Sequence, residues 1–272
     1  MGHDLSANRL PWLLTGPDGY LGGRIKALCA ARGLDVTSIT RSDVNLLDAK
    51  GVARFVPQER VILHCAAPVP KAMEDYMDEV MAEHAVAMVR SLLATRPARM
   101  IFASSMTVYV DVPSPVREED APAPGSGYAG GKRRAEMLIQ DSGIPATILR
   151  LPGLFGAPRK SGFLYNAARA IATGKDFQIG NRPKIWAALH VDDAAEAMVR
   201  AADLTGPTRV LNVGYSGRFS LDRALIQLRQ GVVLDDAPGF EMDLTRMRET
   251  IGELPRTWSE RVAEILREAA GA

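Results

Sequence analysis

The sequence predicts an α/β fold in which a doubly wound parallel sheet is covered by helices on both faces. Short apolar runs alternate with stretches whose apolar residues recur at helical spacing. The alternation begins with a strand at 12–14, followed by a helix that contains Ile25 and Leu28. A glycine-rich turn joins that strand to that helix. Further strands are expected at 36–39, 61–65, 100–104, 146–151 and 210–213.

Length, charge and cysteine usage limit the class of protein. The chain has 272 residues, of which 47% are hydrophobic, enough for one large domain with a small appended lobe. The formal net charge is +1, so we expect neither nucleic acid nor a membrane as a partner. No apolar run approaches the roughly 20 residues that span a bilayer, and residues 1–9 are polar without a signal-peptide pattern, so a cytoplasmic protein is expected. Cys29 and Cys65 lack metal-ligand spacing, so two buried reduced thiols and no metal are expected.

Three glycines mark the first turn as a phosphate site. Gly16 can make the sharp turn out of the strand, Gly19 lets the backbone approach a pyrophosphate, and Gly22 permits close packing of the helix on the strand. An ordinary glycine-rich turn is the alternative, but the strand-turn-helix context favours a dinucleotide. The residues expected to bind the cofactor here are Gly16, Asp18, Gly19, Tyr20, Leu21 and Gly22.

The end of the second strand predicts which dinucleotide binds. An acidic residue there binds the ribose 2′-hydroxyl, whereas a basic residue accommodates a 2′-phosphate. This chain has Arg41 between Thr40 and Ser42, so NADP(H) is expected in preference to NAD(H). A solvated surface arginine is the alternative. Asn45 and Leu46, which follow, are included in the predicted cofactor site.

Small residues follow the third strand. Cys65, Ala66 and Ala67 leave room for a flat ligand at the carboxyl end of a parallel strand, so they join the predicted cofactor site. His64 lies just before them in an apolar run. We interpret it as a hydrogen-bonded core residue rather than a catalyst.

Several helices are predicted from local patterns. Asp48 is expected to cap a helix that ends at Phe55. A methionine-rich stripe from Met73 to Leu92 predicts one helical face, buried in the core or in a subunit contact. Asp193 is expected to cap a later helix, with Glu196 completing a capping box. Further helices are expected at 163–173, from Ser220 and after Pro255.

Ser105, Tyr128 and Lys132 form the predicted catalytic set. Tyr128 and Lys132 lie four residues apart, on one face of a helix expected at 128–140. A free tyrosine titrates near pH 10, so it needs a cation such as Lys132 nearby to act as an acid or base at neutral pH. Ser105 follows a strand and can orient a substrate oxygen toward Tyr128. Gly130 and Gly131 disfavour this helix, which indicates that something approaches it closely.

With these residues the chain resembles an extended short-chain dehydrogenase/reductase of the NAD-dependent epimerase/dehydratase type, which has a Rossmann-type fold. The matching segments are Thr15-Gly-Pro-Asp-Gly-Tyr-Leu-Gly22, His64-Cys-Ala-Ala67, Ser104-Ser-Met-Thr-Val-Tyr109, Tyr128-Ala-Gly-Gly-Lys132, Leu149-Arg-Leu-Pro-Gly-Leu-Phe-Gly156 and His190-Val-Asp-Asp193. They follow in family order over most of the chain. The resemblance implies that Ser105, Tyr128 and Lys132 are catalytic.

The same resemblance implies further contacts. Tyr128 and Lys132 would also bind the cofactor, Lys132 at the nicotinamide ribose. Pro152, Gly153 and Leu154 would lie against the nicotinamide carboxamide. Relatives typically act on nucleotide-linked sugars and form homodimers through the two helices that correspond to 73–93 and 128–140.

Two features depart from the family pattern. Epimerases often have an arginine for the substrate diphosphate four residues before the His-Val-Asp-Asp signature, where this chain has Trp186. Only Arg182 and Lys184 lie close to it in the sequence. Val110 follows Tyr109 where a glycine is common. These departures and the short C-terminal lobe predict a smaller or less charged substrate pocket.

These observations predict a dinucleotide-binding domain over 1–155 and a small C-terminal substrate lobe over 156–272, interleaved with the last core strands. The expected function is NAD(P)-dependent hydride transfer at a carbonyl or secondary-alcohol carbon of a small molecule, with a sugar nucleotide as one candidate. A nucleotide-sugar epimerase or dehydratase with retained NAD is the alternative. A non-catalytic dinucleotide-sensing regulator is a third hypothesis.

Overall fold

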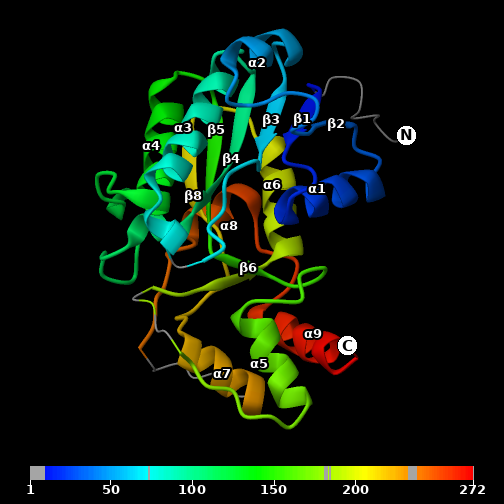
Figure 1. Ribbon diagram of the computed structural model, residues 1–272, viewed down its shortest axis with the longest axis vertical. Coiled ribbons are helices and arrows are strands. Elements are labelled where there is room, and N and C mark those ends of the chain that lie inside the picture. The colour runs from blue at the N-terminus through cyan, green and yellow to red at the C-terminus, as the bar shows by residue number, and fades with distance from the viewer. Residues whose placement is uncertain (1–9, 73, 181–182, 184, 232–237, 272) are drawn as a thin grey trace. The chain divides into compact units, whose positions relative to one another are not determined.

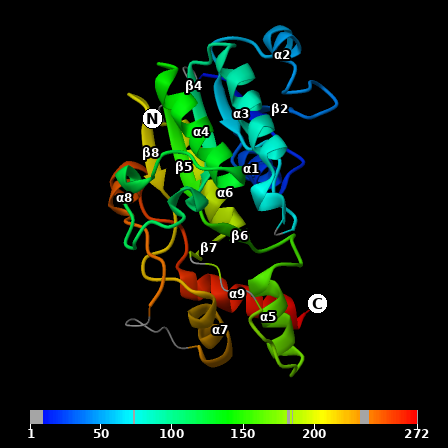
Figure 2. The same cartoon turned by 60° about the vertical axis from the view of Figure 1, so that its left-hand side comes forward.

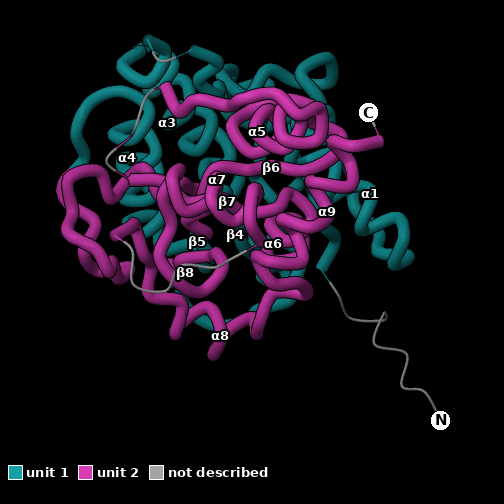
Figure 3. Tube along the Cα trace, turned by 90° about the horizontal axis from the view of Figure 1, so that it is seen from below, with its two compact units in different colours: residues 1–103, 124–148, 198–209 teal, residues 104–123, 149–197, 210–272 magenta. Residues whose placement is uncertain are grey.

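The computed structural model describes residues 10–72, 74–180, 183, 185–231 and 238–271. The expectations for 1–9 and for Met73, Arg182 and Lys184 lie outside these ranges. The chain divides into two compact units, shown in Figure 3. Unit 1 contains Met1–Ala103, Pro124–Ile148 and Met198–Arg209, and unit 2 contains Ser104–Ala123, Leu149–Ala197 and Val210–Ala272.

A six-stranded sheet has the order β2-β1-β3-β4-β5-β8. Its strands are β1 (Trp12–Thr15), β2 (Val36–Ile39), β3 (Val61–His64), β4 (Arg99–Ser105), β5 (Ala146–Leu151) and β8 (Arg209–Asn212). β1 pairs in parallel with β2 on one side and with β3 on the other, with Trp12 opposite both Val36 and Val61. The strand order therefore reverses between β1 and β3, which is where ligands bind in open α/β sheets. The doubly wound parallel fold is confirmed.

Helices of unit 1 follow the predicted local signals. α1 (Tyr20–Ala31) comes after the glycine turn, and Asp48 caps α2 (Ala49–Phe55) by accepting a hydrogen bond from Lys50 N. α3 (Glu79–Leu93) and α4 (Gly127–Asp141) pack against each other on one face of the sheet, as Figures 1 and 2 show. A Cβ at Gly131 of α4 would lie 2.8 Å from Ala82 of α3, so the two helices are in close contact.

The core role predicted for the methionine stripe was wrong for Met77 and Val80, and the alternative, a subunit contact, stays a prediction. A short 3₁₀ helix, η2 (Glu74–Met77), precedes α3, and α3 begins only after Asp78, which caps it at Met81 N. Met77 and Val80 are exposed. The buried face consists of Ala82, Ala85, Val86, Ser91, Val89, Leu92 and Leu93. Small side chains near the start of this face permit the close approach to α4, which long methionines would prevent.

Unit 2 has a second, smaller sheet and helices of its own. β6 (Gly153–Phe155) pairs in parallel with β7 (Ala188–His190). α5 (Phe163–Ala172) packs against α7 (Leu221–Gln230) and α9 (Trp258–Ala270). The prediction that Ser220 begins a helix is confirmed, since its Oγ accepts from Arg223 N. The sequence analysis missed α8 (Thr245–Ile251).

The predicted capping role of Asp193 and Glu196 was also wrong. α6 (Val191–Ala202) begins directly after β7, so Asp193 already lies inside the first turn. Its buried carboxylate accepts two hydrogen bonds from Arg261 of α9, at 2.6 and 2.8 Å, and one from the hydroxyl of Tyr215. Asp193 therefore joins α6 to α9 through a buried ion pair.

A second buried polar network joins loops of unit 2 to β5 and β8. Arg150, on β5, donates to the hydroxyl of Tyr109 at 2.6 Å and to the carbonyl of Glu118 at 2.7 Å. The Tyr109 hydroxyl donates to Asn212 Oδ1 at 2.6 Å, and burial raises the pKa of Tyr109 to about 12. The polar side chains of Arg150, Tyr109 and Asn212 thus have partners, and the motif segments at 104–109 and 149–156 are joined by a hydrogen bond.

No helix in the described part of the chain is long and apolar enough to cross a membrane.

The Asp193–Arg261 pair provides a stability prediction. Replacing Arg261 with Met leaves the Asp193 carboxylate buried without its cation, and we expect a loss of about 3–5 kcal/mol in the free energy of unfolding. Arg229 pairs with Asp176 at the surface, with side chains 42% and 70% exposed, so Arg229→Met is the matched control. It should change stability by less than about 1 kcal/mol. Urea unfolding measures both, and equal losses in the two variants would contradict the prediction.

Candidate active site

The turn after β1 requires glycine at two positions. Gly16 has a φ of +72°, and a Cβ there would lie 2.8 Å from the backbone nitrogen of Ala66. A Cβ at Gly22 would lie 2.0 Å from the carbonyl oxygen of Gly16. The structure therefore brings Gly16, Gly22 and Ala66 together where the sheet order reverses. Backbone fills the space that side chains would need.

The N-terminus of α1 suits an anion. Gly19 is the N-cap residue and supplies no side-chain cap, and the first turn contains no acidic residue. By contrast, α2, α3, α7 and α9 are capped by Asp48, Asp78, Ser220 and Thr257. Amide groups at a helix N-terminus without such a cap attract phosphate through both hydrogen bonding and the helix dipole. Asp18 and Gly19 of the predicted site are exposed, Tyr20 is half-buried, and Leu21 is buried.

The loop after β2 presents Arg41 to solvent. Thr40 donates from its backbone N and its hydroxyl to the Asp43 carboxylate, both at 2.7 Å, and these bonds lower the pKa of Asp43. Sequence reasoning missed Asp43, which holds this loop in shape. Asn45 is exposed and its Oδ1 accepts from Leu47 N at 3.0 Å, while Leu46 is buried.

The end of β3 is held to the end of β1 by hydrogen bonds. Thr15 Oγ1 accepts from Ala66 N at 3.3 Å and lies 2.7 Å from Nδ1 of His64. His64 is buried and stacks on Phe102 with ring centroids 5.8 Å apart, so its predicted structural role is confirmed. Burial lowers the pKa of His64 to about 3, so its imidazole is neutral. Cys65, Ala66 and Ala67 are half-buried, and burial raises the pKa of the Cys65 thiol to about 12.

Lys132 is a buried cation of unit 1. Its side chain is buried, and Nζ donates to the carbonyl of Ala103 at 2.8 Å. Nζ also lies 4.8 Å from the ring centroid of Phe102 and 5.9 Å from that of Tyr128. Burial lowers the pKa of Lys132 to about 8, so the side chain is mostly cationic at neutral pH. A cation this close to a tyrosine ring, in a poorly solvated place, is suited to favouring the tyrosinate.

The structure explains the glycines around Tyr128. A Cβ at Gly130 would lie 1.9 Å from the carbonyl oxygen of Gly125, and Gly131 contacts Ala82. The expected close approach to α4 is therefore made by the protein itself. Tyr128 is half-buried, and its ring lies edge-on to that of Tyr76 at a centroid distance of 5.8 Å.

Ser105 and the segment at 152–154 belong to unit 2. Ser105 is buried, precedes the 3₁₀ helix η3 (Met106–Tyr109), and its Oγ accepts from Thr107 N at 3.2 Å. Thr107 Oγ1 also donates to it, at 3.0 Å. These contacts orient the Ser105 oxygen and leave its hydroxyl proton for an acceptor. Pro152 is buried, Gly153 exposed and Leu154 half-buried.

The residues of unit 1 fit a dinucleotide. Gly16 and Gly22 provide a backbone surface that a Cβ would disrupt, and α1 offers its first-turn amides. The described residues contain no cluster of three His, Cys, Asp or Glu side chains suited to a metal. Residues 16–22 would hold the pyrophosphate, and Lys132 supplies a cation at the end of β4.

The buried cation predicts a pH dependence of stability. The pKa of Lys132 is about 8 in the folded protein, whereas an unfolded lysine titrates near 10.4. Above pH 8 the folded state loses a proton that the unfolded chain still holds, so the cost of burying Lys132 decreases as pH rises toward 10. Relative to Lys132→Met, the unfolding free energy of the apo-protein should rise by up to about 1.4 kcal/mol per pH unit in this window. Chemical denaturation from pH 7 to 10 measures it, with the exposed Lys50→Met as control. If the unfolding free energies of wild type and Lys132→Met change with pH in parallel, the lowered pKa of Lys132 is refuted.

Known proteins resemble this chain in sequence and in fold. The dTDP-4-dehydrorhamnose reductase of Mycobacterium tuberculosis is 26% identical over 234 residues, covering 79% of this chain and 74% of that protein. The fold matches UDP-glucose 4-epimerase of Thermotoga maritima with UDP-glucose (TM-score 0.76, 18% identity, 95% of this chain and 98% of that one). It also matches the Thermus thermophilus enzyme in complex with NAD (TM-score 0.74, 19% identity, 97% and 100%).

The family model described as "NAD dependent epimerase/dehydratase family" matches residues 12–214. The predicted resemblance and the predicted type of enzyme, a short-chain dehydrogenase/reductase-type oxidoreductase or epimerase, are confirmed. This chain belongs to the NAD-dependent epimerase/dehydratase family.

Proposed function

We propose that the protein is an NADPH-dependent reductase that converts a ketone to a secondary alcohol. The observation that carries the proposal is the buried, cationic Lys132 one helical turn from Tyr128. A binding module that only senses a dinucleotide has no need to bury a lysine beside a tyrosine, and burial of a charge is costly. Perturbed titratable groups of this kind concentrate at catalytic sites.

In this proposal the nicotinamide, when bound, supplies the hydride to the carbonyl carbon. Tyr128 gives its hydroxyl proton to the carbonyl oxygen, which becomes the alcohol oxygen. Lys132 stabilises the resulting tyrosinate until a proton from water restores the hydroxyl. Ser105 donates a hydrogen bond to the same substrate oxygen and orients it.

Arg41 supports NADPH as the cofactor. Its guanidinium is exposed after β2, and a guanidinium binds a 2′-phosphate through charge-assisted hydrogen bonds. The Mycobacterium tuberculosis relative is named as a reductase, whereas the Thermus thermophilus epimerase is in complex with NAD. An epimerase with retained NAD is therefore the second candidate function.

Unit 1 also supports the proposed homodimer. The exposed apolar side chains of Tyr76 and Met77 in η2, Val80 in α3 and Met137 in α4 are the kind of surface that a subunit contact covers. A cytoplasmic location stays a prediction.

Cofactor use distinguishes the two candidate functions. A reductase exchanges its cofactor at every turnover, so the purified protein should release little dinucleotide on denaturation and should consume NADPH stoichiometrically with a ketone. Tyr128→Phe should lower turnover by a factor on the order of 10² or more and leave dinucleotide binding nearly intact. Tyr76→Phe, which alters the neighbouring ring, is the control. A full complement of NAD with no net change in NADPH absorbance would support the epimerase, and normal turnover in Tyr128→Phe would exclude its proposed role.

Arg41 provides a separate test of cofactor preference. Arg41→Ala should weaken NADPH binding by about 10- to 100-fold, because it removes a charged partner of the 2′-phosphate, and should hardly alter NADH binding. Arg54→Ala, at another exposed arginine, controls for a general loss of positive charge. Fluorescence titration measures the dissociation constants of NADPH and NADH for wild type and for each variant. Equal losses for both cofactors would make Arg41 an ordinary surface residue.

A further inference from the structure

The helix α4, which contains Tyr128 and Lys132, is capped by a residue of another helix. Its own N-cap residue, Ser126, makes no capping hydrogen bond from its side chain. The first amide of the helix, that of Gly127, donates to Oε1 of Glu79, which lies in the first turn of α3. A carboxylate in this place satisfies a helix amide and complements the positive end of the helix dipole. Glu79 therefore caps α4 one residue before Tyr128.

The carboxylate of Glu79 is itself held in place by α4. Its Oε2 pairs with Arg134 at 3.1 Å. Arg134 also donates to the carbonyl of Gly125 at 3.1 Å and lies 3.3 Å from Oε1 of Glu83. The hydrogen bonds from Gly127 and Arg134 lower the pKa of Glu79, so its side chain is charged at neutral pH. Both carboxylate oxygens thus bind α4, one at its first residue and one at its second turn.

The backbone at the start of α4 also fits closely against the chain before α3. Gly127 has a φ of +62°, and a Cβ there would lie 2.1 Å from the carbonyl oxygen of Tyr76. Gly127 therefore contacts the segment 76–79 twice, once by packing and once by the hydrogen bond to Glu79. This segment sets the position of Gly127 and so that of Tyr128, which follows it.

The other member of the proposed catalytic pair is anchored elsewhere. Lys132 Nζ donates to the carbonyl of Ala103 and lies over the ring of Phe102, and both of these residues are in β4. The ring of Tyr128 lies 5.9 Å from the same Nζ. The separation of tyrosine and lysine thus depends on where the first turn of α4 is held. In proton transfer, a displacement of about 1 Å can cost a factor on the order of 10² in rate.

We propose that Glu79 is a positioning residue, which places the hydroxyl of Tyr128 for proton transfer by capping α4 at Gly127. The inference rests on the role of Tyr128 in the function proposed above. Without Glu79, the amide of Gly127 loses its acceptor and the first turn of the helix can fray. The hydrogen bond carries the effect, so an uncharged side chain that keeps the acceptor oxygen can replace the carboxylate.

Steady-state kinetics with NADPH and a ketone test the effect on the reaction. Glu79→Ala should lower kcat by about tenfold or more and leave NADPH binding nearly intact, because residues 16–22 are untouched. Glu79→Gln keeps an acceptor for Gly127 and should stay within about threefold of wild type. Glu83→Ala is the matched control, since it also removes a carboxylate from Arg134 but none from Gly127. It should leave kcat unchanged.

A double variant separates positioning from a general loss of structure. In the Tyr128→Phe background no hydroxyl remains to be placed, so Glu79→Ala should lower the residual turnover by less than about twofold. If Glu79→Ala lowers turnover by the same factor in both backgrounds, its role is merely structural and the proposal is overturned.

Fluorine NMR of protein labelled with 3-fluorotyrosine follows the ring without any reaction. The signal of Tyr128 is the one that Tyr128→Phe removes. It should move in Glu79→Ala and stay in place in Glu79→Gln and Glu83→Ala. A signal that does not move in Glu79→Ala overturns the proposal, whatever the turnover.

The two measurements together distinguish failure of this proposal from failure of the proposed function. If the signal moves but wild type reduces no ketone, or Tyr128→Phe turns over normally, Glu79 places Tyr128 and the proposed function fails. If Tyr128→Phe is slow and Glu79→Ala has the kcat of wild type, the positioning proposal fails alone.

Discussion

The close approach of the chain after β1 to the chain after β3 is the constraint on which the candidate cofactor site depends. Gly16 leaves no room for a Cβ against Ala66, and Thr15 hydrogen-bonds both Ala66 and His64. These contacts lie where the strand order reverses, so they place the start of α1 beside the end of β3. They explain why His64 is buried and neutral: its ring nitrogen completes the connection between the two strand ends instead of taking part in proton transfer.

Lys132 lies in a second place where glycines permit close packing. Gly130 and Gly131 allow α4 to lie against the loop at Gly125 and against Ala82, and Lys132, the next residue of the same helix, is buried. Its ammonium then has the Ala103 carbonyl and two aromatic rings in place of water. Burial lowers the pKa of Lys132 to about 8, so the side chain stays mostly cationic at neutral pH. Because this cation is buried, it can stabilise a neighbouring anion strongly. The two glycines therefore lower the helix propensity of α4 but permit its close packing beside the buried cation.

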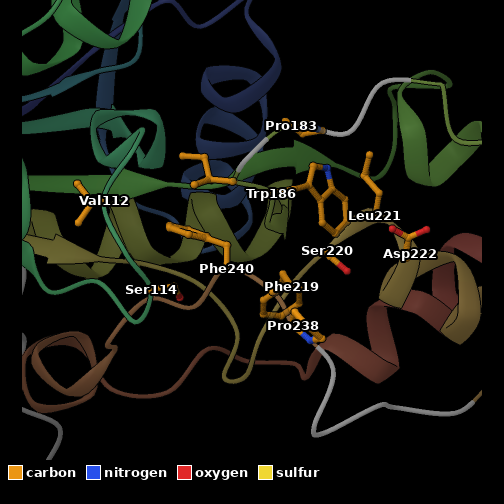
Figure 4. A pocket seen from close by; sticks show the side chains of 12 residues that line it. Val112, Ser114, Pro183, Trp186, Phe219, Ser220, Leu221, Asp222, Pro238 and Phe240 are labelled. Atoms are coloured by element: carbon orange, nitrogen blue, oxygen red, sulfur yellow. The ribbon is translucent and has the colours of Figure 1, made fainter.

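Features set by neighbouring residues were predictable, and features set by distant residues were not. β2 and β5, the Asp48 and Ser220 caps and the glycine turn follow from short patterns of residues. The role of Asp193 depends on Arg261, 68 residues away, so a nearby Glu196 gave the wrong interpretation. The buried face of α3 is likewise decided by its contact with α4, which no periodicity within α3 can indicate. The pocket of unit 2, shown in Figure 4, is lined by described residues from four separate parts of the chain, among them Val112, Trp186, Phe219 and Phe240, and no local pattern indicated it.

The departures from the family pattern can be compared with the charged side chains that each unit offers to a ligand. In unit 1, Arg41 and Lys132 offer cations, which suit a phosphorylated dinucleotide. In unit 2, the described pocket lining includes the aromatic side chains of Trp186, Phe219 and Phe240. An epimerase must hold its substrate while the reacting sugar turns over, and a diphosphate bound by arginine provides such an anchor. A reductase needs one productive orientation only. Trp186 in place of arginine therefore removes one anchor of the kind that an epimerase uses, which supports the proposed reductase.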